Sequence, residues 1–174
     1  MSDLVPTPEF SRMADIRAID TLPVHLVASE RECAGLARRF AIVSVQKLEA
    51  RIALEKQGDT VVATGTMDAQ FVQSCAISAD DLPVTVHETL NLRFVPATAA
   101  ARIEAEIELE AKDLDVIDFN GTAFDLGEAV AQTLALAIDP FLEGPQADRV
   151  RRELGLNDPG ASGPFAALAA LKKN

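Results

Sequence analysis

Leu48-Glu49-Ala50-Arg51-Ile52-Ala53-Leu54, with the turn signal Gln57-Gly58-Asp59 and the Val- and Thr-rich residues 60–75 after it, decides the fold. Apolar residues alternate with Glu, Arg or Ala in the first run, and a period of two is typical of a strand with one buried face. A glycine-containing turn between two such runs indicates a hairpin. We therefore predict an antiparallel pair, with residues 42–56 and 60–75 as its strands.

Further strands are predicted on both sides of this hairpin. Residues 10–19 and 22–27 have strand-like runs, and Asp80-Asp81-Leu82-Pro83 breaks the chain before residues 84–95, whose apolar side chains fall mostly at even positions. Residues 103–110 alternate Ile, Ala and Leu with Glu. Their composition favours a helix, but their strict alternation favours a strand, which is our prediction.

Capping signals place two helices. Ser29 with Glu32 three residues on matches a capping box and predicts a helix over residues 30–39. Asp125 with Glu128 predicts a second helix that ends before Pro140, with apolar residues at positions 126, 130, 134 and 138 on one face. Residues 163–174 begin with Gly-Pro and end in lysines, as a short terminal helix would.

These elements predict an α+β fold in a single domain, built as an antiparallel, twisted sheet with a few helices packed on it. Residues 1–9 contain two prolines and are predicted to be a loose N-terminus. Residues 10–143 would form the domain. Residues 144–174 are predicted to be an exposed linker, rich in Gly and Pro up to position 163, followed by the short terminal helix.

Composition narrows the classes of function. The chain of 174 residues has no Trp or Tyr and a pI near 4.6, so aromatic stacking on bases and broad phosphate binding are disfavoured. The N-terminus lacks the pattern of a signal peptide, and no apolar run reaches the length of a membrane span. Cys33 and Cys75 are too few for a disulfide framework. We expect a soluble, cytoplasmic protein.

The negative charge is concentrated in one segment. Residues 97–148 contain twelve Asp and Glu against two basic residues, which accounts for −10 of the formal net charge of −11. Such a surface attracts basic partners over long distances. Asp125 and Glu128 are explained by helix capping. The remaining candidates for partner contact are Glu104, Glu106, Glu108, Glu110, Asp113, Asp115 and Asp118.

Catalytic chemistry has little support in the residue pattern. His25 and His87 lie in strand-like runs without a nucleophile motif, and surface histidines are the expected interpretation. Cys33 falls on the inward stripe of its helix, as a buried small hydrophobic residue would. There is no glycine-rich phosphate loop, and Asp113, Asp115 and Asp118 match a calcium loop only loosely. We predict no enzyme activity, no cofactor and no metal.

Five segments, in this order, resemble the YceD family of large ribosomal RNA subunit accumulation proteins, in its alphaproteobacterial form. They are Glu9–Arg12; Ser29–Glu32 continuing to Phe40; Val72–Cys75 with Leu82–Val84 and Leu92–Pro96; Phe124–Glu128 continuing to Pro140; and Pro164–Lys172. The resemblance covers most of the chain. Many members of the family carry Cys-x-x-Cys where this chain has Cys75 and Ser78, so the thiolate pair that structural zinc would need is absent here.

The resemblance implies a non-enzymatic, cytoplasmic role in the synthesis, processing or accumulation of large-subunit ribosomal RNA. The leading hypothesis is that the acidic surface binds a basic ribosomal protein or a preribosomal particle. The alternative is direct contact with ribosomal RNA through short arginine clusters. The candidates for that contact are Arg38, Arg39, Arg149, Arg151 and Arg152.

Overall fold

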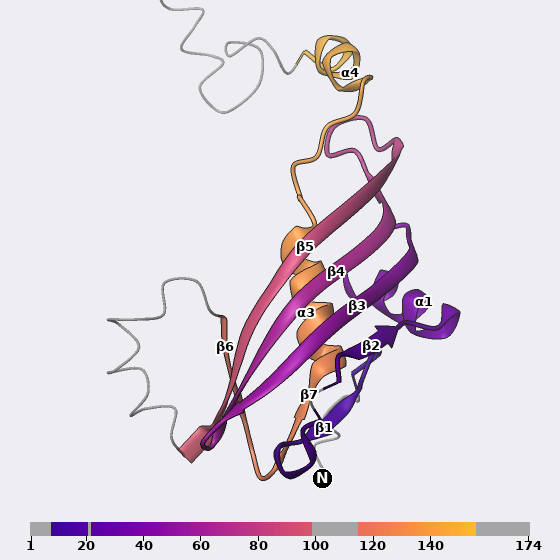
Figure 1. The fold of residues 1–174 in the computed structure, drawn as a ribbon. Coiled ribbons are helices and arrows are strands. Elements are labelled where there is room, and N and C mark those ends of the chain that lie inside the picture. Colours follow the sequence, from indigo (N-terminus) through magenta and orange to yellow (C-terminus); the bar gives the residue numbers. More distant parts are fainter. Residues whose placement is uncertain (1–7, 21, 99–114, 156–174) are drawn as a thin grey trace, which may run out of the picture. The chain divides into compact units, whose positions relative to one another are not determined.

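The computed structural model describes residues 8–20, 22–98 and 115–155, and it has the predicted α+β fold (Figure 1). A five-stranded sheet has the order β2-β3-β4-β5-β6, and a separate two-stranded sheet pairs β1 with β7. The chain forms two compact units. The first comprises residues 1–72 and 83–138, and the second comprises residues 73–82 and 139–174.

The predicted hairpin forms the centre of the sheet. Strands β3 (Ser44–Gln57) and β4 (Thr60–Ser74) pair antiparallel, with Gln57 opposite Thr60. Gly58 takes a φ of +63° in the turn, a left-handed conformation that glycine adopts without steric cost. Leu48 and Ile52 are at most 1% exposed. The alternation therefore identified the buried face correctly.

The outer strands extend this pair. Strand β2 (Val24–Val27) pairs antiparallel with residues 49–52 of β3. Strand β5 (Asp81–Pro96) neighbours β4, and β6 (Asp115–Phe119) pairs parallel with residues 92–96 of β5, so the sheet is mixed at this edge. The break predicted at residues 80–83 is wrong from Asp81 onward. Pro83 is accommodated because β5 has a described neighbour on only one side before Leu92, and an edge strand tolerates proline.

Both predicted helices are present in the first unit. Helix α1 spans Glu30–Arg39 and has the predicted Ser29–Glu32 capping box. Helix α3 spans Leu126–Ala137 and is capped by Asp125. Figure 1 shows α3 running along one face of the curved strands, where its apolar side chains join the core of the sheet. The Phe94 and Phe124 rings stack there at a centroid distance of 4.3 Å.

The N-terminal segment is less regular than predicted. Instead of one strand over residues 10–19, it has the short strand β1 (Met13–Asp15) and a 3₁₀ turn (Ile16–Ala18). Strand β1 pairs with β7 (Ala123–Asp125), which leads directly into α3. Phe10 is fully buried before β1 begins. The buried Phe10 and the turn that Asp15 caps interrupt the segment, so one continuous strand does not form.

The second unit contains the turn after β4 and residues 139–155. Helix α4 (Ala147–Glu153) occupies a stretch that was predicted to be an exposed linker. Glycines and prolines before and after it suggested a loop, but the run between them has helical partners, such as Arg149 and Glu153 four residues apart. The predicted terminal helix (163–174) and the predicted strand over 103–110 lie outside the described residues. None of the helices described is both long enough and apolar enough to span a membrane.

Candidate functional site

Residues 9–12 lie between α1 and α3 and are held there by a network of charged and hydroxyl side chains, here called the polar clasp. Its members are Glu9, Ser11, Arg12, Ser29, Glu32, Arg39, Asp125 and Glu128. They come from three of the segments that carry the family resemblance. The first and last of these segments are more than a hundred residues apart in the chain.

Arg12 connects the N-terminal segment to α1. Its guanidinium donates two hydrogen bonds to Glu32, of 2.6 and 3.0 Å, and others to the backbone oxygens of Ser11 and Val27. Glu32 also accepts from the Ser29 amide at 2.7 Å. These contacts, the Arg12 hydrogen bond above all, lower the pKa of Glu32 to about 2. A paired carboxylate of this kind stays charged well into the acid range.

Asp125 connects the same segment to α3. Its carboxylate accepts from Ser11 Oγ at 2.5 Å, from the Arg12 amide at 2.7 Å and from the Glu128 amide at 3.1 Å. The sequence identified the last contact as a helix cap. The two contacts to residues 11 and 12 span more than a hundred positions, and no local pattern in the sequence indicates them.

Arg39 closes the network on the other side. It donates to both oxygens of Glu128, at 2.7 and 2.6 Å, and to Glu9 at 3.2 Å. The Glu128 hydrogen bond is the main cause of the raised pKa of Arg39, and it also lowers the pKa of Glu128. A bidentate pair of this geometry is among the stronger charge-assisted contacts. Arg39, a candidate for RNA contact, is therefore engaged by the fold.

Two glycines permit the close approach of the helices to residues 9–12. A Cβ on Gly127 would lie 2.7 Å from the Phe10 carbonyl oxygen and 2.8 Å from the Arg12 nitrogen. A Cβ on Gly35 would lie 2.9 Å from Cγ of Glu9. The clasp is thus a packing element as well as a charge network. Its polar groups are paired with one another, which makes its role structural.

The structure describes only some of the acidic candidates for partner contact. Asp115 and Asp118 are exposed on β6, at the parallel edge of the sheet. Glu104, Glu106, Glu108, Glu110 and Asp113 lie outside the described residues. The prediction of a partner-binding acidic surface therefore stays a prediction.

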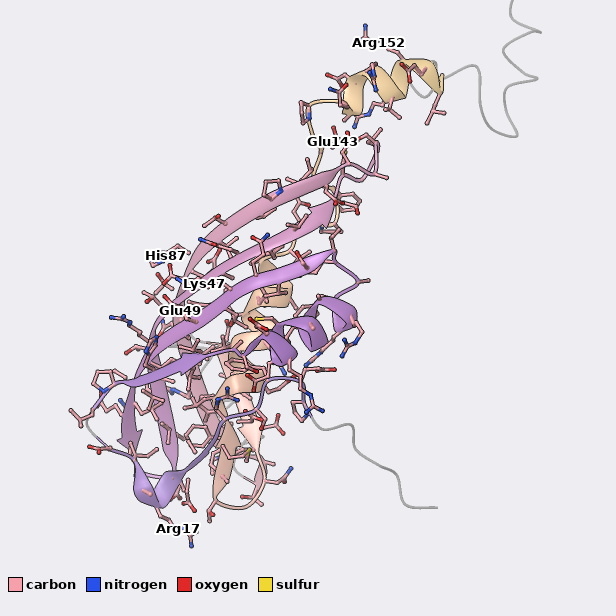
Figure 2. All side chains as sticks on the ribbon, turned by 90° about the vertical axis from the view of Figure 1, so that its right-hand side faces the viewer. Arg17, Lys47, Glu49, His87, Glu143 and Arg152 are labelled. Atoms are coloured by element: carbon pink, nitrogen blue, oxygen red, sulfur yellow. The ribbon has the colours of Figure 1, made fainter. Side chains whose placement is uncertain are left out.

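Most of the arginine candidates have partners. In α4, Arg151 pairs with Glu143 and Asp148, Arg149 lies 3.5 Å from Glu153, and Arg152 donates to the Asp148 carbonyl. Figure 2 labels Glu143 and Arg152 in this unit. Arg38, on α1, is exposed and makes no ion pair with a described residue. Direct contact with RNA through these arginines therefore stays a prediction.

Both histidines lie on the face of the sheet that α3 leaves open. His87 Nδ1 is 2.7 Å from Asp68 Oδ1, and His25 Nε2 is 3.9 Å from Glu49. Glu49 and Asp68 are directly opposite across β3 and β4, and Figure 2 shows Lys47, Glu49 and His87 on this side. His87 and Asp68 form an exposed pair, and hydrogen bonding from His87 lowers the pKa of Asp68. The expected surface histidines are confirmed.

Both cysteines are buried, Cys33 at 5% and Cys75 at 4% exposed, but their surroundings differ. Cys33 is buried as predicted, and burial raises the pKa of its thiol. Cys75 was expected within a strand, but β4 ends at Ser74 and Cys75 begins a turn in the second unit. Its Sγ accepts from the amides of Ser78 at 3.3 Å and Gly144 at 3.2 Å. Hydrogen bonding from Ser78, then from the Gly144 amide, lowers the pKa of Cys75 to about 7.

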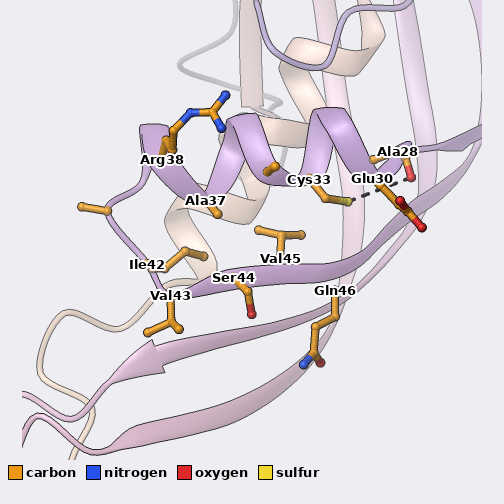
Figure 3. A pocket seen from close by; sticks show the side chains of 12 residues that line it. Ala28, Glu30, Cys33, Ala37, Arg38, Ile42, Val43, Ser44, Val45 and Gln46 are labelled. Carbon is orange, nitrogen blue, oxygen red and sulfur yellow. Dashed lines mark hydrogen bonds between the residues drawn. The ribbon is translucent and has the colours of Figure 1, made fainter.

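A groove of about 460 Å³ opens between α1 and the first residues of β3 (Figure 3). Its apolar floor includes Cys33, Ala37 and Val45, and Glu30 lies at one end. The guanidinium of Arg38 points away from β3 (Figure 3). A smaller cavity of about 240 Å³ lies beside Ile16 and Leu54. Neither cavity is lined by a histidine. Across residues 8–20, 22–98 and 115–155, no cluster of three or more His, Cys, Asp or Glu could hold a metal ion.

Comparison with known proteins finds no relative of this chain. No family model matches the chain, no curated protein matches it, and no solved structure matches its fold. The fold defines the class, an α+β protein with a mixed sheet, and any narrower assignment depends on the sequence segments and their arrangement.

Proposed function

We propose that this protein is a non-enzymatic factor in the biogenesis of the large ribosomal subunit. The observation that supports the proposal is the polar clasp. Segments 9–12, 29–40 and 124–128 resemble the YceD family as an ordered set, and in the fold their charged residues bind one another. Residues that bind one another constrain one another's identity, so these contacts support reading the three segments as parts of one pattern.

The mode of action that we propose is binding through the acidic segment to a basic ribosomal protein or a preribosomal particle. Asp115 and Asp118 present exposed carboxylates on β6, within the described part of that segment. The pairing of Arg39, Arg149 and Arg151 with carboxylates supports protein contact over direct contact with RNA. An interaction of exposed charges speeds encounter and weakens as salt rises.

The cellular role is tested by depleting the protein and measuring the ratio of large- to small-subunit ribosomal RNA. We expect the ratio to fall and to recover when the chain is expressed again. An unchanged ratio, with growth impaired for other reasons, would contradict the proposed role. The measurement is independent of which surface binds the partner.

The binding surface is tested by recovery of ribosomal proteins on the tagged chain across a salt series. The variant carries Gln at positions 104, 106, 108 and 110. A matched control neutralises four exposed acids elsewhere, Glu55, Asp59, Asp81 and Glu88, so that net charge changes equally. We expect recovery to fall for the first variant only. Equal loss in both would reduce the effect to net charge, and equal recovery in both would exclude the acidic surface.

A further inference from the structure

The corner between β6 and β7 contains the one Asn-Gly pair of the sequence, Asn120-Gly121. Strand β6 ends at Phe119 and β7 begins at Ala123, and the two strands belong to different sheets. Figure 1 shows the chain turning sharply between them. The pair therefore lies in a corner between two sheets and not in a hairpin whose strands bond to each other.

The described part of the chain leaves the reactive groups of this pair unengaged. Asn120 and Gly121 are both exposed, and neither the Asn120 carboxamide nor the Gly121 amide hydrogen-bonds to a described residue. Gly121 has a φ of +76°, and the position that a Cβ would take there has no atom within 4 Å. Because glycine moves between backbone conformations with little steric cost, the Gly121 nitrogen and the Asn120 side chain are free to meet.

An asparagine followed by glycine cyclises when these conditions hold. The Gly121 nitrogen attacks Cγ of Asn120, and the side-chain nitrogen leaves as ammonia, taking up the proton that the backbone nitrogen loses. The product is a five-membered succinimide, which water opens at either carbonyl. Opening at one carbonyl gives aspartate, and opening at the other gives isoaspartate, in which the backbone runs through the former side chain. The sequence of steps consumes water and requires no oxidant or reductant.

The surroundings of the corner accept the product without disturbing the core. Phe119 and Phe124 are buried on its two sides, with ring centroids 5.7 Å apart. Residues 120–122 between them are exposed. The methylene group that isoaspartate inserts and the carboxylate that it adds would enter water, where a charge is not desolvated. Conversion therefore does not require the rings on either side to separate.

We propose that Asn120 is a modification site, at which the native chain converts through a succinimide with Gly121 to isoaspartate and aspartate. An isoaspartyl carboxylate is the group that methyltransferases of isoaspartyl repair esterify with S-adenosylmethionine, so this enzyme class is the partner that the converted corner would take. Conversion also adds a negative charge two positions after Asp118. The proposal depends neither on the ribosomal role nor on the polar clasp.

The test incubates the full-length chain at mildly alkaline pH, where a backbone amide loses its proton more readily, and samples it over time. Peptide mass spectrometry locates the mass gain of an amide that becomes a carboxylate, and methyl transfer from labelled S-adenosylmethionine by an isoaspartyl methyltransferase counts isoaspartate. We expect both signals in the peptide that contains position 120. Asn91 precedes Leu92 within β5 and should keep its amide, because a following side chain and a strand backbone hinder the attack.

A comparison of native and unfolded protein separates the effect of the fold from that of the sequence. In guanidinium chloride the chain keeps its Asn-Gly pair but loses the corner. We expect the native and the unfolded chain to convert at rates of the same order, because the described contacts do not restrain the pair. A native chain that retains the Asn120 amide while the unfolded chain loses it would show that the fold protects this position, which overturns the proposal.

Two variants identify the reacting groups. Asn120→Gln keeps a carboxamide but must close a larger ring, and Gly121→Ala places a Cβ beside the attacking nitrogen at a positive φ. Both should lose methyl incorporation into the peptide that contains position 120. Since position 120 is exposed, Asn120→Gln should keep the circular dichroism melt of the wild type, so that loss of the signal is not a loss of fold. Undiminished incorporation into this peptide in Asn120→Gln would contradict the assignment.

Discussion

Gly127 and Gly35 offer a sharp test of how residues 9–12 are packed. Both are buried glycines in helices that contact this segment, and replacing each by Ala adds one methyl group. The methyl at Gly127 would meet backbone atoms of Phe10 and Arg12 at 2.7 and 2.8 Å. The methyl at Gly35 would meet the side chain of Glu9, at 2.9 Å from Cγ and 3.0 Å from Cβ. At Gly127 the backbone atoms cannot yield without moving the segment, whereas at Gly35 the exposed Glu9 side chain can rotate its Cγ away and its Cβ needs to shift by only a few tenths of an ångström.

The magnitudes follow from two opposing effects. Gly→Ala in a helix interior gains up to about 1 kcal/mol in helix propensity. Forcing a group into a filled site costs typically about 1–3 kcal/mol. At Gly127 the gain is smaller, because it is only the second residue of α3, so we expect a net loss of about 1–2 kcal/mol. At Gly35 rotation of Glu9 weakens an exposed ion pair with Arg39, worth less than about 1 kcal/mol. We expect Gly35→Ala to lie between no change and a small gain.

Urea unfolding followed by circular dichroism measures both free energies of unfolding. With a slope of about 1–3 kcal/mol per molar urea, the Gly127→Ala midpoint should fall by about 1 M, and the Gly35→Ala midpoint should stay or rise. The same Gly35 substitution in a Glu9→Ala background separates the propensity gain from the lost ion pair. A Gly127→Ala protein as stable as the wild type, or equal losses at both positions, would refute the described packing.

Three further predictions concern charge and reactivity. The pKa of Glu32 is lowered from 4.5 to about 2, so the carboxylate stabilises the fold above about pH 4.5 and loses that effect as pH falls toward 2; Glu32→Gln should be less stable than wild type at pH 7, and the gap measured by urea unfolding should close in acid. A double-mutant cycle with Arg39→Met and Glu128→Gln should give a coupling energy of about 1 kcal/mol for their bidentate pair, and a coupling near zero would mean that the pair contributes nothing to stability. Cys75 and Cys33 are equally buried, at 4% and 5% exposed, but the pKa of Cys75 is lowered to about 7 and that of Cys33 is raised; when local opening admits iodoacetamide, Cys75 should therefore be labelled first, with a rate that rises around pH 7, as mass spectrometry of the native protein would show, and preferential labelling of Cys33 would contradict the surroundings described for both thiols.

Local patterns in the sequence determined the central elements of this fold. The hairpin of β3 and β4, the capping box of α1 and the Asp125 cap of α3 all appear where the pattern predicts them. Each depends on residues within a few positions of one another, such as the turn at Gly58 or the Ser29–Glu32 contact. Short-range steric and hydrogen-bonding preferences are encoded directly in adjacent residue types, which is why these elements could be read from the sequence.

Only the tertiary structure decided how these elements meet. The parallel pairing of β6 with β5 and the start of β5 at Asp81 depend on strands that are distant in the chain. Helix α4 depends on side-chain pairs within its own residues, but the glycines and prolines around it predicted a loop. The same holds for the candidate sites. Arg39 could be counted as a candidate RNA contact from sequence, but its engagement by Glu128, eighty-nine positions away, became visible only in the fold. The groove likewise forms because the turn after α1 leads the chain back, so that the first residues of β3 lie beside the helix. Long-range contacts of this kind are set by packing geometry, and the residue types alone do not specify which distant partner they meet.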